Sequence, residues 1–190
     1  MHTRKLTVLA LFTTLALAIY SLESLLPPVV PLPGVKLGLA NIITLLVLHL
    51  YNARDAALVL LARVLLSALL FGQAMSLLYS LCGGLLCFAA MTLASRLLHR
   101  RFPELTSILG GIFHNIGQIL AALLITAVPG VLVYLPYLLI SGIVTGFFTG
   151  LCTRFALGCL RRLPSSRLPV FSGVGIVVLS YAFSYALAGC

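Results

Sequence analysis

The chain has 190 residues, of which 62% are hydrophobic and 8% are charged, and its formal net charge is +9. Soluble domains average about 25% charged residues, so this composition excludes an ordinary soluble fold and is typical of an integral membrane protein. With no soluble domain to display a basic face, the excess of cations favours contact with the cytoplasm and anionic lipid and argues against nucleic-acid binding.

Six apolar segments are predicted to cross the membrane as helices, because a crossing needs about twenty apolar residues. Prolines between residues 27 and 33 and the sequences NARD, FGQ, HRRFPE and VPG separate the segments, and all are turn or helix-ending chemistry. The first segment has no small-residue cleavage site and is interpreted as a retained helix. The expected spans are 5–26, 37–51, 55–71, 75–98, 105–128 and 131–158.

The predicted fold class is therefore an all-α integral membrane protein, a compact bundle of six transmembrane helices. The bundle is expected over residues 1–163, and residues 164–190 form a basic linker and an apolar C-terminal segment. That last segment is about long enough for a seventh crossing, and hydropathy does not decide whether it crosses or lies against the bundle.

The distribution of cations predicts the orientation. With six spans and a cytoplasmic N-terminus, Lys36 faces outward, Arg63 lies inside a span, and every other cation falls on the cytoplasmic side. These cytoplasmic cations are Arg4, Lys5, Arg54, Arg96, Arg100, Arg101, Arg154, Arg161, Arg162 and Arg167.

Polar side chains at membrane depth are the candidate binding groups, because such residues usually face the bundle interior or a water-filled cavity. Arg63 is predicted to lie about 12 Å deep and His114 about 14 Å deep, from the helical rise per residue. Gln118 follows His114 by one turn, so GGIFHNIGQ forms a polar stripe flanked by glycines. The predicted substrate-binding residues are Lys36, Asn41, Arg63, Gln73, Tyr79, His114, Asn115, Gln118 and Tyr137.

Structural alternatives stay open for several of these residues. With Glu23 expected to pair with Lys36, Arg63 has no carboxylate at its depth and either anchors an anionic group or is a structural cation bound by carbonyls and amides. His114 fits ligand contact and an interhelical hydrogen bond equally well. The tyrosines near Pro136 are also typical of an aromatic belt.

The proline-rich sequence PPVVPLPG precedes Lys36 and cannot face lipid in an extended conformation. We expect it to fold over the outer mouth of the bundle as a lid, with Lys36 at its rim beside Asn41. The alternative is a rigid connector on which Lys36 extends to the membrane interface.

Small residues repeat at four-residue spacing in the first span, at Ala10, Thr14 and Ala18. Such a stripe lets another helix approach closely, either within the bundle or on a partner protein.

Known catalytic motifs are missing. Three carboxylates cannot supply the paired aspartate-rich motifs with which prenyl synthases hold magnesium and diphosphate. The sequence has no P-loop, and its five cysteines do not have metal-ligand spacing. We therefore expect no enzyme activity, no cofactor and no metal site.

Two sequence elements, PGVKLGLAN and HNIGQ, resemble the Gx transporter family, also labelled heptaprenyl diphosphate synthase component I, and the similarity extends over about residues 5–160. That family is similar to the substrate-binding S components of energy-coupling factor transporters. The resemblance implies a six-helix subunit that binds a solute near the outer side and pairs with a transmembrane coupling protein and ATPase subunits. It also implies that Ala10, Thr14 and Ala18 dock the coupling protein.

Two functions follow from these observations. The first is a solute-uptake subunit of the bacterial inner membrane, whose small-molecule substrate carries an anionic or hydrogen-bonding head group. The second is an accessory membrane subunit of prenyl diphosphate or quinone precursor biosynthesis, in which the same cavity would hold a lipid tail.

Overall fold

The computed structural model describes residues 2–25, 36–71 and 74–162, and all regular structure in these ranges is helical. The elements are α1 (His2–Ser24), α2 (Asn41–Leu50), α3 (Ala53–Phe71), α4 (Ala74–Leu97), α5 (Pro103–Thr126), the short 3-10 helix η1 (Pro129–Tyr134) and α6 (Leu135–Arg162). The expected lid over 27–34 and the C-terminal segment over 164–190 lie outside the described residues.

Four stretches are long and apolar enough to cross a membrane: most of α1, most of α4, all of α5, and η1 together with α6. The 19-residue helix α3 is mostly apolar but carries three charged side chains, Arg54, Asp55 and Arg63. The structure thus supports an all-helical protein with several helices suited to a membrane.

The prediction of a helix over the whole of 37–51 is wrong. α2 begins only at Asn41 and has ten residues, so it is about 15 Å long, half the thickness of the hydrocarbon. The residues before it are not helical, and Gly38 adopts a left-handed φ of +81° that an L side chain rarely adopts. The apolar run therefore divides into a turn and a short buried helix.

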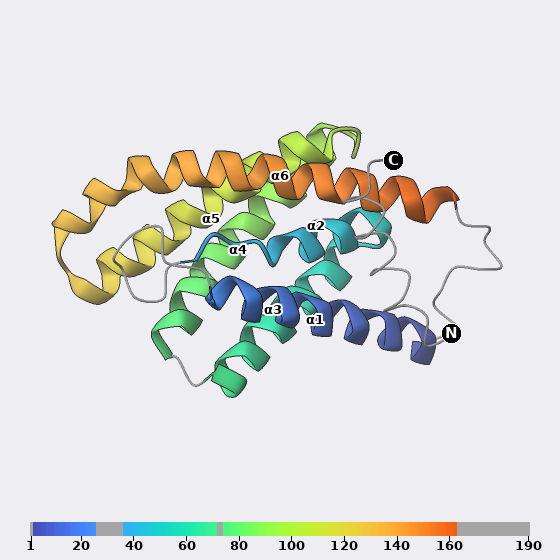
Figure 1. Ribbon diagram of the computed structural model, residues 1–190, viewed down its shortest axis with the longest axis horizontal. Helices are drawn as coiled ribbons and strands as arrows, with labels where there is room; N and C mark the ends of the chain where they lie inside the picture. The colour runs from blue at the N-terminus through green and yellow to red at the C-terminus, as the bar shows by residue number, and fades with distance from the viewer. Residues whose placement is uncertain (1, 26–35, 72–73, 163–190) are drawn as a thin grey trace.

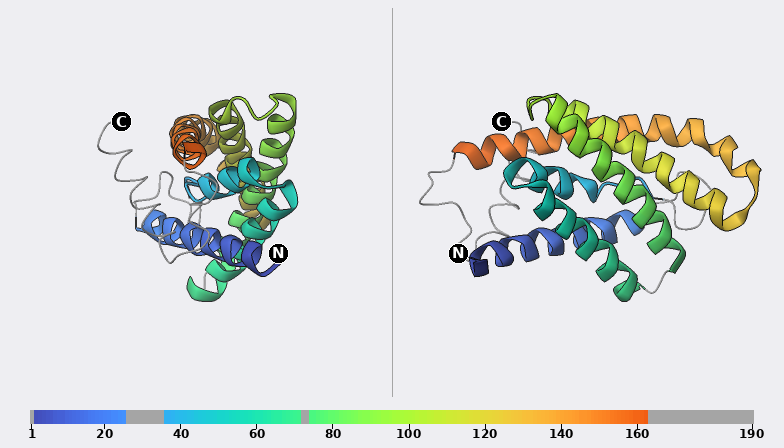
Figure 2. Two further views of the ribbon diagram at one scale, coloured as in Figure 1. Left: turned by 90° about the vertical axis from the view of Figure 1, so that its right-hand side faces the viewer. Right: turned by 180° about the vertical axis from the view of Figure 1, so that it is seen from behind.

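α2 occupies the centre of the molecule. α6 and α1 extend along opposite sides, and α2 lies between them (Figure 1). It contacts every other α-helix, and its residues from Ile43 to Leu48 are all buried. Figure 2 shows the same arrangement end-on, with α4 and α5 on one flank.

Glycines bring α5 and α6 into backbone contact. A Cβ atom added to Gly111 on α5 would lie 2.3 Å from the carbonyl oxygen of Gly142 on α6. One turn further along α6, a Cβ on Gly146 would lie 2.8 Å from the Cα atom of Ile108. Small residues at such positions let membrane helices approach closely, so these glycines set the α5–α6 distance.

Polar contacts join the helices at one end of the bundle. Lys5 on α1 forms an ion pair with Asp55 on α3 at 2.7 Å. Arg154 on α6 pairs with Glu104 on α5 at 2.8 Å, and Arg100 donates to the carbonyl of Tyr51, which follows α2, at 3.2 Å. Lys5, Arg100 and Arg154 are among the cations predicted to lie on the cytoplasmic side.

Candidate functional site

The turn that leads into α2 is the point where buried charged groups meet. The carboxylate of Glu23, near the end of α1, accepts a hydrogen bond from the backbone N–H of Gly38 at 2.6 Å. Arg63 on α3 donates from Nη2 to the side-chain oxygen of Asn41 at 3.3 Å. Glu23 is 5% exposed and Arg63 is 3% exposed, so both charges lie inside the protein. The Gly38–Asn41 turn therefore connects an acid and a base from two different helices.

This geometry corrects the expected pairing of Glu23. Glu23 bonds to the Gly38 N–H, and among the described residues no ion pair joins Glu23 to Lys36. Lys36 donates to the hydroxyl of Ser24 at 2.5 Å, and its ammonium lies 3.4 Å from the centre of the Tyr20 ring. Arg63 contacts the side-chain amide of Asn41, as in the alternative in which carbonyls and amides bind this cation.

His114 packs against the other side of the same turn. A Cβ on Gly38 would lie 2.7 Å from the imidazole Cδ2, and a Cβ on Gly83 of α4 would lie 2.9 Å from its Nδ1. The Nε2 atoms of Gln118 and His114 are 3.2 Å apart, as expected for side chains one helical turn apart. His114 and Arg63 thus both lie against residues of one turn, Gly38 and Asn41.

The other predicted binding residues do not join this group. The Asn115 amide donates to the carbonyl of Leu138 at 2.5 Å and belongs to the α5–α6 contact. Tyr79 is buried in an apolar cluster with Ala121, Ala122 and Val131. Tyr137 is 64% exposed and so is not part of the buried polar group. Gln73 lies outside the described residues.

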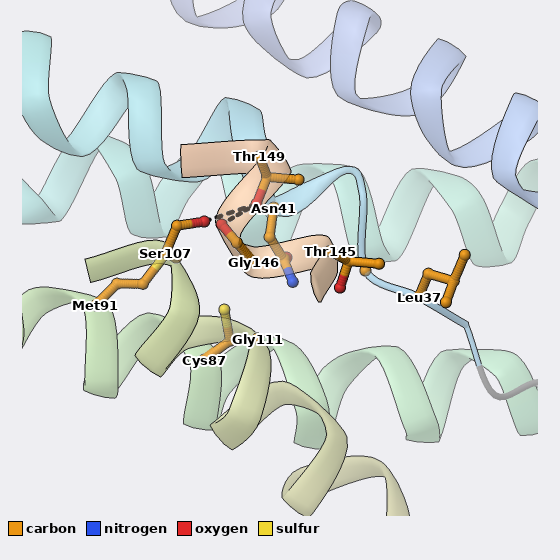
Figure 3. Close-up of a pocket in the computed structure, with 10 residues that line it drawn as sticks. Leu37, Asn41, Cys87, Met91, Ser107, Gly111, Thr145, Gly146 and Thr149 are labelled. Atoms are coloured by element: carbon orange, nitrogen blue, oxygen red, sulfur yellow. Dashed lines mark hydrogen bonds between the residues drawn. The ribbon is translucent and has the colours of Figure 1, made fainter. Parts of the chain in front are cut away.

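A small cavity lies beside the turn, between α2, α5 and α6. Its volume is about 10 Å³, room for roughly one water molecule. Figure 3 shows the amide nitrogen of Asn41 pointing toward the middle of the lining side chains, with the bonded hydroxyls of Ser107 and Thr149 at one edge. The lining residues are Leu37, Gly38, Asn41, Cys87, Met91, Ser107, Gly111, Thr145, Gly146 and Thr149.

Of the cavity residues, only Asn41 was among the predicted binding residues. Ser107 and Gly111 on α5, and Thr145 and Thr149 on α6, each stand four residues apart, so each pair faces the same direction. This spacing could have indicated a polar α5–α6 face. Hydroxyl groups usually bond within their own helix, so the sequence did not single out these serine and threonine residues as candidates.

The predicted docking residues Ala10, Thr14 and Ala18 are exposed on α1. They are therefore not part of the internal packing of the described residues, which was the alternative interpretation.

Taken together, the described residues form an all-helical protein whose apolar helices are consistent with a membrane protein and whose ionisable groups Glu23 and Arg63 are buried near a short central helix. The chain belongs to the heptaprenyl diphosphate synthase component I family, whose model matches residues 12–156. Neither the curated proteins nor the solved structures contain a match to this chain.

Proposed function

We propose that this chain is a substrate-binding membrane subunit for uptake of a small solute, similar to an S component and energised by a partner. In this proposal it is a multi-pass protein of the bacterial inner membrane with six crossings and a cytoplasmic N-terminus. The charged end formed by α1, α3, α5 and α6 would then face the cytoplasm, as the positive-inside rule expects.

One observation carries the proposal: buried polar groups from three helices converge on the Gly38–Asn41 turn, next to a cavity. Burial of charged side chains is costly, and apolar residues of similar volume are often at least as stabilising. A role in packing alone does not account for Glu23 and Arg63 at 5% and 3% exposure. Groups held at depth in membrane proteins usually serve a ligand or its pathway.

The energy source would be a partner protein. α1 presents small, exposed side chains at Ala10, Thr14 and Ala18, a surface on which another membrane helix could pack closely. By resemblance, that helix belongs to a transmembrane coupling protein associated with ATPase subunits. The chain itself has no P-loop for ATP hydrolysis.

The test is to purify the protein in mild detergent and identify retained small molecules by mass spectrometry. Asn41→Leu keeps a similar volume but removes the side-chain hydrogen bonds, and we expect at least about tenfold less retained molecule. The matched control is Ser95→Ala, because Ser95 is buried and its hydroxyl bonds only within its own helix, to the Thr92 carbonyl at 2.9 Å. Equal retention by Asn41→Leu and wild type would contradict the proposal, and so would the absence of any retained molecule.

The family match favours a second candidate function, an accessory membrane subunit of prenyl diphosphate or quinone precursor biosynthesis. In that case the chain would act with a soluble synthase and would not be the catalyst, since it has only three carboxylates. Affinity purification from native membranes distinguishes the two. Recovery of a soluble synthase favours the second function, and recovery of ATPase subunits favours the first.

A further inference from the structure

We infer that the cavity between α2, α5 and α6 binds an uncharged, hydrogen-bonding group of the ligand. This inference rests on the proposed function and adds the substrate class. It also places the ligand contact on the hydroxyl-bearing face of α5 and α6, and not on the HNIGQ stripe.

The cavity lining has no charged side chain, which disfavours an ionic ligand. The ten lining residues include four polar side chains, Asn41, Ser107, Thr145 and Thr149, and none of the lining residues is an acid or a base. The buried groups Glu23 and Arg63 are already bonded to the neighbouring turn, at the Gly38 N–H and the Asn41 side chain. A charged ligand group would lose its hydration here without gaining a counter-charge from the lining.

The polar side chains of the lining can form hydrogen bonds, which favours a polar ligand. The side-chain oxygen of Asn41 is used by Arg63, and its amide nitrogen points into the cavity as a donor. The hydroxyls of Ser107 and Thr149 lie 2.7 Å apart, and Thr149 donates to the carbonyl of Gly146 at 3.1 Å, so Ser107 donates to Thr149. A hydroxyl or amide group in the cavity could accept from Asn41 and donate to one of these two oxygens.

The size of the cavity limits what enters. In the described conformation it has room for roughly one water molecule. A larger ligand would insert one polar group here, and admitting more requires α6 or the Leu37–Asn41 segment to move outward. For α6 to move outward, the contact between Gly146 and the backbone of α5 would have to break.

The experiment is affinity selection with mass spectrometry on the purified full-length protein. The probe is an equimolar mixture of small metabolites in matched sets: uncharged alcohols and amides, carboxylates, phosphates, amines and zwitterions. The test variant is Ser107→Ala/Thr149→Val, which removes both hydroxyls at nearly constant volume. The control variant is Thr153→Val, because Thr153 is a fully buried threonine of α6 whose hydroxyl bonds to the Thr149 carbonyl and does not line the cavity.

We expect wild type and Thr153→Val to retain uncharged members of the mixture, and Ser107→Ala/Thr149→Val to retain at least tenfold less. Circular dichroism in detergent shows whether the double variant is folded, and Thr145→Val replaces it if it is not. Retention of anions that is lost in Arg63→Gln and unchanged in the hydroxyl variants overturns the inference but leaves the uptake function standing. Retention of nothing by wild type counts against both.

Discussion

The contact between α5 and α6 makes a quantitative prediction for Gly111→Ala. The added Cβ would lie 2.3 Å from the Gly142 carbonyl oxygen, whereas ordinary contacts begin near 3.4 Å. The neighbour is backbone and cannot rotate away, so the helices must separate by about 1 Å, which places the cost near the upper end of overpacking, about 3 kcal/mol. Replacing glycine by alanine within a helix returns about 1 kcal/mol. We expect a net loss of about 2 kcal/mol in the free energy of unfolding.

Gly158 on α6 provides the matched control, because a Cβ there would meet nothing within 4 Å. Gly158→Ala should therefore be neutral or stabilise by up to about 1 kcal/mol. The measurement is reversible unfolding by sodium dodecyl sulfate in mixed micelles, followed by circular dichroism. If Gly111→Ala proves as stable as Gly158→Ala, the backbone contact between α5 and α6 is not present as described.

Three further predictions use the same unfolding measurement. Glu23→Gln and Arg63→Met should each lower the free energy of unfolding by about 3 kcal/mol, because each leaves a buried charge uncompensated. The double variant should lose clearly less than the sum of the two single losses. Strictly additive losses would show that the two charges do not compensate each other. Lys36→Met should cost about 1 kcal/mol through loss of its contacts with an aromatic ring and a hydroxyl, and an unchanged stability would argue against this contact. Arg154→Gln should cost less than about 0.5 kcal/mol, because the side chain is 69% exposed, and a large loss would indicate that this end of the bundle is not solvated.

The sequence predicted the helix boundaries well where strong punctuation exists. Pro103 begins α5, and the predicted spans 55–71 and 75–98 match α3 and α4 closely. Hydropathy failed at α2, because Leu37 and Leu39 are as apolar as the helix that follows. It does not register that Gly38 takes a left-handed conformation. The sequence therefore shows one continuous apolar run at a point where the chain turns.

Depth along a helix was easier to predict than direction around it. Counting residues placed Arg63 and His114 at similar depth, and both contact the Gly38–Asn41 turn. Residue counts gave no information about which face of α1 points inward, so the contact of Glu23 with the Gly38 N–H was not predicted. The cavity was missed for a related reason, since it depends on how closely α6 packs against α5.

The length of α6 has a mechanical consequence. Its 28 residues extend about 42 Å, well beyond a hydrocarbon layer of about 30 Å. The end that carries Arg154 extends beyond the hydrocarbon, and a helix of this length can change its tilt when the thickness of the bilayer changes. Because Thr145 and Thr149 form one wall of the cavity, a change in the tilt of α6 would alter its width. We expect ligand retention to vary with acyl-chain length in reconstituted vesicles, and retention independent of chain length would show that α6 is held rigidly by its neighbours.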